Sequence, residues 1–435
     1  MANPDSKDVA LDLLAYIHAS PSAAHAVTET TRRLEAGGFT SLDEADAWSL
    51  SPGQGVFVTR NHTSVIAVRL GSEPLWESGA RIAGAHTDFP GLRLKPRGVY
   101  SKCGYLQLSV EIYGGPLLHT WTDRDLGLAG RAVVDTGDGP PETRVYDLAR
   151  PLCRIPSLAP HIQPKKKDSL TLNKQTHMPP ILGLGGEKDA GADRMRELIA
   201  EALEIDPQAI QTFTVEPYDL QPGALGGVNE EFIQTRSYDN LASCHAAMTA
   251  LLESPPQRHT QIIALFDNEE VGSQTMQGAG SRFLDMVLER MCESTERPRE
   301  ALYRAIARSF IVSADGAHAV HPSYADAHEP HHHPVLGGGP VIKVNANERY
   351  TTQLEAQALL QACADRAGIS LQHFVARTDV GTGSTIGPMT ATRLGIRSID
   401  IGNPMLAMHS IRETAGTADQ AAMAKLLAEF LTADD

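Results

Sequence analysis

The sequence has no apolar run that approaches the roughly 18 residues needed for a membrane-spanning helix. Its apolar runs are short stretches such as residues 262–266. The N-terminus lacks the basic segment and apolar segment of a secretory signal peptide. The 5 cysteines are odd in number and scattered, and none forms a Cys-x-x-Cys pair. These absences argue against a disulfide framework and a cysteine zinc site. They predict a cytoplasmic protein without membrane contacts.

Basic residues are also in short supply. The chain has 38 Lys and Arg against 53 Asp and Glu, a net charge of −15. Phosphate backbones repel a chain this acidic, so a general nucleic-acid-binding function is excluded. The hydrophobic fraction of 42% is ample for a core and excludes disorder as the main state. At about 100–200 residues per domain, 435 residues predict two or three domains, or one domain with a large insertion.

The pattern of apolar and polar residues along the sequence changes near residues 90 and 237. Residues 106–113 alternate between apolar and polar side chains, which indicates antiparallel strands. One helix is expected within this segment, at residues 190–203. After residue 238 helices alternate with short apolar strands, as in a βα sheet. Strands are expected at residues 81–85, 261–266, 310–313 and 398–401, and helices at 241–253, 281–293, 298–308, 352–366 and 417–431. Thr417 and Gln420 have the spacing of a capping box.

Several of these apolar strands end in residues that bind metals. Residues 81–85 lead to His86 and Asp88, and residues 261–266 lead to Glu269 and Glu270. Asp315 follows residues 310–313, and His409 follows residues 398–401 after a short loop. In open α/β sheets, ligands bind beyond the carboxyl ends of the strands. The sequence therefore predicts one cluster of imidazoles and carboxylates at one edge of a sheet.

A further acid, Asp239, begins a helix directly after the inserted segment. Two histidines with several carboxylates suit zinc, manganese or cobalt. Carboxylates that crowd together raise one another's pKa unless a cation is present. Each residue also has a structural interpretation: Asp239 as a helix N-cap, and Glu269 and Glu270 as a solvated first helical turn. The coincidence at several strand ends favours the metal site.

Taken in order, these segments resemble the M18 metallopeptidases, the aspartyl aminopeptidase family. The motifs that carry the resemblance are Ala85-His86-Thr87-Asp88, Ser237-Tyr238-Asp239-Asn240, Phe266-Asp267-Asn268-Glu269-Glu270-Val271-Gly272-Ser273, Ser313-Ala314-Asp315 and Met408-His409-Ser410-Ile411-Arg412-Glu413. Residues 113–115, 121–126 and 341–345 extend it to nearly the whole chain. It implies an α/β fold: a central mixed sheet flanked by helices in a zinc-peptidase-like catalytic domain, residues 1–89 and 238–435. Residues 90–237 would be an inserted β-rich dimerisation domain.

The resemblance also implies roles for the clustered residues. Asp239 would bridge two divalent ions, most simply zinc, with cobalt or manganese as alternatives. One ion would be completed by His86 and Asp315, the other by Glu270 and His409. Asp88 would orient His86, and Glu269 would be the general base that takes a proton from a bridging water and returns it to the departing amine. The expected activity is removal of N-terminal acidic residues, Asp or Glu, from peptides.

Two more residues receive roles through the resemblance. His161, in the inserted domain, would reach the metals and the substrate in a neighbouring subunit of a homododecamer built from dimers. Lys343 would hold the acidic side chain of the substrate, because Lys is a usual partner of carboxylate. A loop histidine and a surface lysine are the structural alternatives.

Other functions remain open at this point. A same-fold deacylase or carboxypeptidase would not require a substrate α-amine, and a non-catalytic metal-stabilised shell protein would not need Glu269. The tract at residues 328–333 is rich in histidine but lies in a Pro-containing loop, where adventitious metal binding is expected. The glycines of residues 381–387 have the wrong spacing for a dinucleotide fingerprint, and we expect this loop to line the peptidase cleft.

Overall fold

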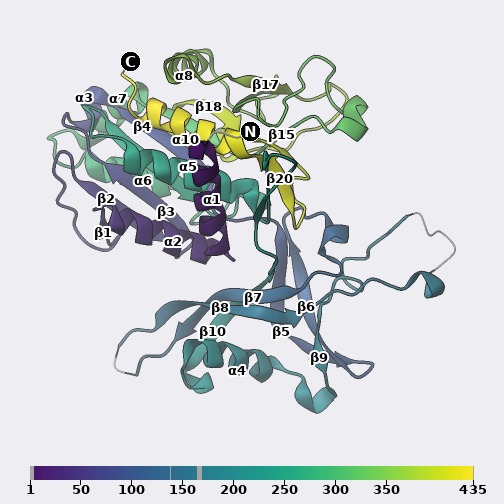
Figure 1. The fold of residues 1–435 in the computed structure, drawn as a ribbon. Coiled ribbons are helices and arrows are strands. Elements are labelled where there is room, and N and C mark those ends of the chain that lie inside the picture. The colour runs from purple at the N-terminus through teal and green to yellow at the C-terminus, as the bar shows by residue number, and fades with distance from the viewer. Residues whose placement is uncertain (1–3, 138, 164–168, 435) are drawn as a thin grey trace. The chain divides into compact units, whose positions relative to one another are not determined.

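A computed structural model describes residues 4–137, 139–163 and 169–434. The chain divides into two compact units. Unit 1 comprises Met1–Asp88, Gly223–Met408 and Glu413–Asp435, and unit 2 comprises Phe89–Pro222 and His409–Arg412. The elements of each unit can be followed in Figure 1.

Unit 1 contains a nine-stranded mixed sheet in the order β1-β2-β3-β13-β4-β14-β18-β16-β17. At its centre, β4 pairs in parallel with β13 and β14, and β14 pairs in parallel with β18. Because these four strands run in one direction, their carboxyl ends share one edge of the sheet. The strands are β1 Thr40–Leu42, β2 Gly55–Arg60, β3 Ser64–Arg69, β4 Ala80–His86, β13 Thr260–Phe266, β14 Phe310–Ala314, β16 Val341–Val344, β17 Gln372–Val375 and β18 Arg397–Gly402.

Helices flank this sheet. Every second residue of β13, Ile262, Ala264 and Phe266, packs in a core that includes residues of α6, α7 and α9. The intervening Ile263 and Leu265 are equally buried, because α5 and α10 contact the central strands and each other. The helices of unit 1 are α1 Pro4–His18, α2 Ala23–Ala36, α3 Leu75–Ser78, α5 Tyr238–Glu253, α6 Phe283–Met291, α7 Pro298–Arg308, α8 Leu354–Ala367, α9 Ile386–Leu394 and α10 Thr417–Leu431. The predicted α/β fold with a central mixed sheet is confirmed.

Unit 1 also carries a small five-stranded sheet in the order β11-β12-β20-β19-β15. Its strands are β11 Ala224–Gly226, β12 Phe232–Thr235, β15 Ala317–His318, β19 Pro404–Leu406 and β20 Glu413–Gly416. Short 3-10 turns complete the unit at η5 Glu269–Val271 and η6 Pro322–Ala327.

Unit 2 is rich in antiparallel strands, and its two three-stranded sheets have the orders β10-β7-β8 and β5-β6-β9. Its core includes the inward residues of these strands and the apolar face of the one α-helix described in the unit, α4. The elements are β5 Gly91–Lys102, β6 Tyr105–Tyr113, η1 Leu118–Trp121, β7 Leu126–Val134, β8 Glu142–Cys153, η2 Pro160–Ile162, β9 Ile181–Leu184, η3 Glu187–Asp189, α4 Ala192–Leu203, η4 Pro207–Ala209 and β10 Ile210–Asp219.

The predicted helices and strands all appear, with ends shifted by at most three residues. The capping box is wrong. The N-cap of α10 is Gly416, without a side-chain hydrogen bond. The Thr417 hydroxyl instead donates to the Glu230 carbonyl at 2.8 Å, and Gln420 is buried among polar side chains. The Gly-rich residues 381–387 predict a loop, but helix α9 begins within them at Ile386.

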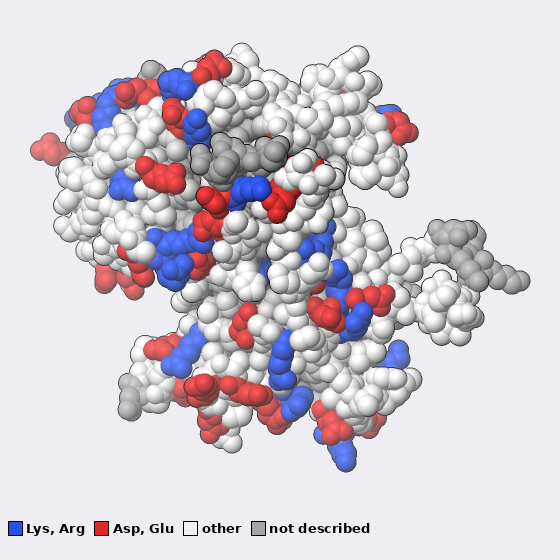
Figure 2. Space-filling model, viewed as in Figure 1, with Lys and Arg blue, Asp and Glu red and all other residues white. Residues whose placement is uncertain are grey.

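Surface charge is mixed on the face that Figure 2 shows, where Lys and Arg side chains are interspersed with Asp and Glu in each unit. None of the helices among the described residues is both long enough and apolar enough to span a membrane.

Candidate functional site

The candidate site lies in unit 1, at the shared edge of the parallel strands. His86 is the last residue of β4. Its register partner is Phe266 on β13, and Glu269 and Glu270 follow in the turn η5. Asp315 follows β14 directly. Strand pairing therefore places these residues at one edge, as the spacing in the sequence predicts.

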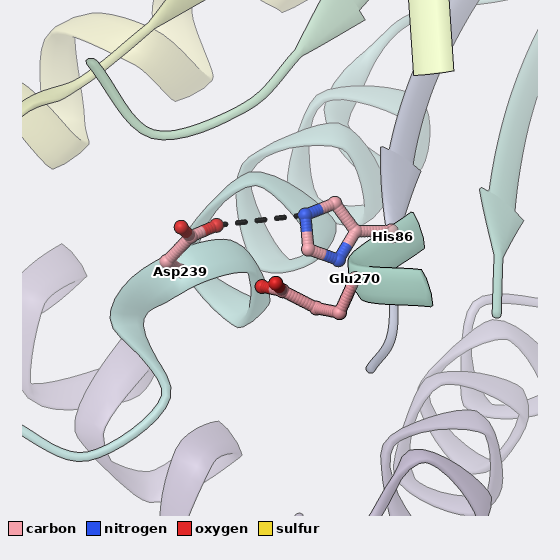
Figure 3. A group of neighbouring side chains, drawn as sticks. All are labelled: His86, Asp239 and Glu270. Atoms are coloured by element: carbon pink, nitrogen blue, oxygen red, sulfur yellow. Dashed lines mark ion pairs between the residues drawn. The ribbon is translucent and has the colours of Figure 1, made fainter. Parts of the chain in front are cut away.

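The structure brings three ligand-type side chains together. One atom each of His86, Asp239 and Glu270 lies within 4.8 Å of the other two, a separation that suits a metal ion. Figure 3 shows the imidazole and both carboxylates pointing toward one another. Asp315 joins the group, because His86 Nε2 is 3.5 Å from Asp315 Oδ1 and also 3.5 Å from Asp239 Oδ1. All four residues are buried or nearly so.

Asp239 is not a helix N-cap. The N-cap of α5 is Ser237, and Asp239 has a non-helical backbone within the first turn of the element. Its backbone N–H donates to Glu413 Oε2 at 3.0 Å. Glu413 closes the last motif, but its position in the sequence predicts no role for it. Glu413 is only 2% exposed, and this burial cannot be predicted from the sequence.

Asp88 connects two parts of the site. Its Oδ1 accepts from the backbone N–H of Glu269 at 3.0 Å, and its Oδ2 accepts from that of Glu270 at 3.2 Å. His86 Nδ1 lies 3.0 Å from the Asp88 carbonyl and 3.4 Å from its Oδ1. Asn268 introduces this turn with φ +65°, a left-handed conformation that Asn tolerates. Asp88 therefore fixes the main chain of both glutamates as well as the ring of His86.

The electrostatics of the group favour a cation. Burial raises the pKa of Glu269 to about 8; nearby His86 opposes the rise, whereas the carboxylates around it add to it. Burial and the Asp239 carboxylate likewise raise the pKa of Glu270 well above its usual value. Burial alone would lower the pKa of His86, but its contacts with Asp239, Asp315 and Asp88 raise it well above normal. Such a donor set fits divalent metal ions, whose charge offsets the crowding.

Lys343 on β16 is buried with 3% exposure. Its Nζ lies 3.4 Å from Asp315 Oδ2 and 5.4 Å from the centre of the Tyr350 ring. Burial lowers the pKa of Lys343, but the neighbouring Asp315 outweighs this effect and the net shift is upward. The ammonium group is therefore charged and lies beside the cluster.

The two remaining candidates, His409 and His161, belong to unit 2. His409 has φ +67°, and its Nδ1 lies 3.1 Å from the Gly115 carbonyl. His161 is exposed in η2. Their roles at the metals stay predictions. Among the described residues, the His-rich tract at 328–333 forms no group of three converging ligand atoms.

Comparison with known proteins identifies the chain. The family model for aminopeptidase I zinc metalloproteases (M18) matches residues 16–431. The chain belongs to the M18 family. A probable M18 family aminopeptidase 2 from Pseudomonas aeruginosa (strain LESB58) is 43% identical over 425 residues, which cover 97% of this chain and 98% of the relative.

Solved structures agree with this assignment. A cryo-EM structure of an Ape4 and Nbr1 complex has a chain 39% identical to this M18 protein, with a TM-score of 0.95, and the match covers 98% of this chain and 86% of the other. A structure of the S. cerevisiae mApe1 dodecamer is 28% identical, with a TM-score of 0.85 and coverage of 98% and 97%. The chain is thus a metallo-aminopeptidase of the M18 family, and the cluster at the sheet edge is its candidate metal centre.

Proposed function

We propose that this M18 protein removes N-terminal acidic residues from peptides at a site that holds two divalent metal ions. The observation that carries the proposal is the convergence of His86, Asp239 and Glu270 within 4.8 Å. Asp315 and Lys343 adjoin this group. A metallo-aminopeptidase needs ligands for metal, a base and a means of recognising the first residue. The converging ligands would supply the first, Glu269 the second and Lys343 the third.

Asp239 would bridge the two ions, with His86 and Asp315 on one side and Glu270 on the other. Zinc suits this mixture of imidazole and carboxylate ligands. When bound, the ions would supply Lewis acidity toward water and toward the scissile carbonyl. Asp88 contacts His86 and accepts a hydrogen bond from the backbone of Glu270, so it would orient both ligands toward the metals.

Glu269 would act as the general base. A carboxylate oxygen accepts a proton from the attacking water and then donates it to the amine nitrogen of the departing peptide. Glu269 suits this role because Asp88 holds its backbone next to the three converging ligands.

Lys343 would bind the substrate's acidic side chain. Its ammonium group lies 3.4 Å from Asp315 Oδ2, so a substrate carboxylate bound to Lys343 would lie near the proposed metal site. A charge buried at 3% exposure is costly unless it is paired. A substrate carboxylate would improve that pairing.

We also propose that subunits associate, and that His161 completes a neighbouring site. Leu158 and Ile162, on either side of His161, have exposed fractions of 52% and 69%. Exposed apolar side chains are unfavourable in water, and a partner surface would bury them. One solved relative is a dodecamer. A cytoplasmic location remains a prediction.

A panel of aminoacyl p-nitroanilides tests the proposal. We expect kcat/KM to be highest for Asp or Glu and to depend on added divalent metal. The Lys343→Met variant should lose at least about 30-fold of the preference for Asp over Asn, since removing a buried charged partner costs ~2 kcal/mol or more. Activity on Leu or Lys derivatives that exceeds activity on Asp and Glu would contradict the proposed specificity.

A further inference from the structure

A series of hydrogen-bonded polar side chains lies within unit 1. It runs from Asp12 on α1 to Tyr238, the residue that precedes Asp239. Helices α1, α5 and α10 contact one another (Figure 1), and each supplies a member. Asp12 is on α1, Tyr238 and His245 are on α5, and Gln420 is on α10. Asn403 follows β18. Except for Asp12, whose side chain is 51% exposed, these residues are at most 2% exposed.

The hydrogen bonds at the inner end of this series fix the orientation of Gln420. Asn403 Nδ2 donates to the Tyr238 hydroxyl oxygen and to Gln420 Oε1, both at 2.9 Å. The Tyr238 hydroxyl donates to the same Gln420 oxygen at 3.3 Å. The amide nitrogen of Gln420 must therefore point the other way, and its two hydrogens are donated to the Ala242 carbonyl at 3.0 Å and to His245 Nδ1 at 3.1 Å.

The outer end follows from this orientation. Because His245 Nδ1 accepts from Gln420, its other nitrogen, Nε2, carries the proton and donates to Asp12 Oδ2 at 2.8 Å. Burial lowers the pKa of His245, which agrees with a neutral ring. Arg33 Nη1 donates to the same Asp12 oxygen at 2.7 Å. Each of these donated hydrogens has its own acceptor site, so the proton positions have a single consistent assignment.

Arg236 makes a second contact between α1 and the segment that carries Asp239. Arg236, three residues before Asp239, donates to the carbonyls of Ser20 at 3.0 Å and Ile17 at 2.7 Å, at the carboxyl end of α1. The stretch from Arg236 to His245, which includes Asp239, is thus attached to the N-terminal helices on both sides. Neither contact touches the metal cluster itself.

We propose that the N-terminal helix α1 positions Asp239 for metal binding, through Asp12, His245, Gln420 and Tyr238. These are positioning residues: they act on the backbone that carries a metal ligand. The inference rests on the proposed function, in which Asp239 bridges the metals. It assigns a task to α1, an element that contributes no side chain to the site.

Zinc affinity of the full-length protein, measured by competition with a chelator, tests the inference. We expect Asp12→Ala to weaken zinc binding by about 10-fold, the lower end of the range for groups that orient metal ligands. Asp8→Ala is the matched control, because Asp8 is an exposed acid on the same helix, and it should bind zinc like the unmodified protein. Tyr238→Phe, which removes the inner hydroxyl, should weaken binding in the same way as Asp12→Ala.

A conservative variant separates positioning from loss of charge. Asp12→Asn keeps an oxygen that accepts from His245 and Arg33 but lacks the negative charge, so it should restore zinc affinity. Circular dichroism of each variant checks that it is folded. Zinc affinity of Asp12→Ala equal to that of Asp8→Ala would overturn the inference while leaving the proposed function intact. An unmodified protein that binds no zinc and hydrolyses no peptide would overturn the proposed function, and the inference with it.

Discussion

At the scale of single residues, the neighbours Glu269 and Glu270 show how local environment gives two identical side chains different expected roles. Both follow the same strand, and Asp88 accepts a hydrogen bond from the backbone of each. Only Glu270 has a carboxylate oxygen within 4.8 Å of both the His86 and the Asp239 ligand atoms. Glu269 lies next to this group with a raised pKa. We therefore predict that Glu270 binds metal and that Glu269 moves a proton.

Replacing Glu269 by Gln tests this division. The amide has nearly the same shape but does not accept a proton, so Glu269→Gln should retain bound metal and lose at least about 10²-fold in kcat, the usual contribution of a positioned base. Metal analysis and steady-state kinetics on the same sample measure both quantities. Near-normal turnover in a variant that holds its full metal content would remove Glu269 from the mechanism.

The two acids Asp239 and Asp88 should differ in the same assay. Asp239→Ala removes a ligand that would touch both ions, whereas Asp88→Asn alters a group that orients His86 and the glutamate turn. We expect Asp239→Ala to lose nearly all bound metal, and Asp88→Asn to lose about 10–100-fold in affinity or activity. Equal metal loss in the two variants, measured by atomic emission, would contradict the assignment of Asp239 as the bridge.

At the scale of secondary-structure elements, the site depends on strand direction. The strands β13, β4 and β14 are parallel neighbours, so each delivers its C-terminal residues to the same edge. The arrangement has an energetic cost, because His86, Glu269, Glu270 and Asp315 meet in a buried space. Without a cation, this crowding makes the edge of the sheet sensitive to pH.

The stability of the metal-free protein should therefore fall as pH rises from 5 to 8. Glu269 has a pKa of about 8 in the fold, against ~4.3 in an unfolded chain. Between these values the folded state holds more protons than the unfolded state, so the free energy of unfolding decreases with rising pH. The raised pKa values of Glu270 and His86 act in the same direction.

Thermal unfolding of protein dialysed against a chelator measures this effect. The melting temperature should drop between pH 5 and 8, and Glu269→Gln should reduce the drop because it removes one titrating group. Zinc added at pH 8 should restore the melting temperature. A chelated protein whose melting temperature rises over this range would refute the electrostatic account of the site.

At the scale of the whole molecule, the two units divide the chain unequally. Unit 1 contains the metal cluster, while unit 2 contains His161 and His409. The strands of unit 2 form two sheets of three strands each, and such small sheets have exposed edges that association commonly covers. Subunit association and catalysis should therefore be linked.

Mixing experiments test that link. Dilution to monomers should abolish activity without unfolding unit 1, and His161→Ala should lower kcat while leaving assembly intact. Oligomers that contain both His161→Ala and Asp239→Ala subunits should recover some activity, because each subunit supplies what the other lacks. A fully active monomer would disprove the shared site, as would mixed oligomers without recovered activity.

The sequence by itself determined the central strands, most helices and the order of the metal-type residues, because apolar periodicity and strand ends are local properties. It did not reveal the environment of Gln420. The spacing of this residue from Thr417 matches a capping box, yet its side chain is buried where α10 contacts α5, and it bonds to Tyr238, Asn403 and His245. Only the tertiary structure decided which polar side chains face one another across helices. Burial and pairing depend on contacts between residues more than 170 positions apart in the chain, and no local pattern encodes them.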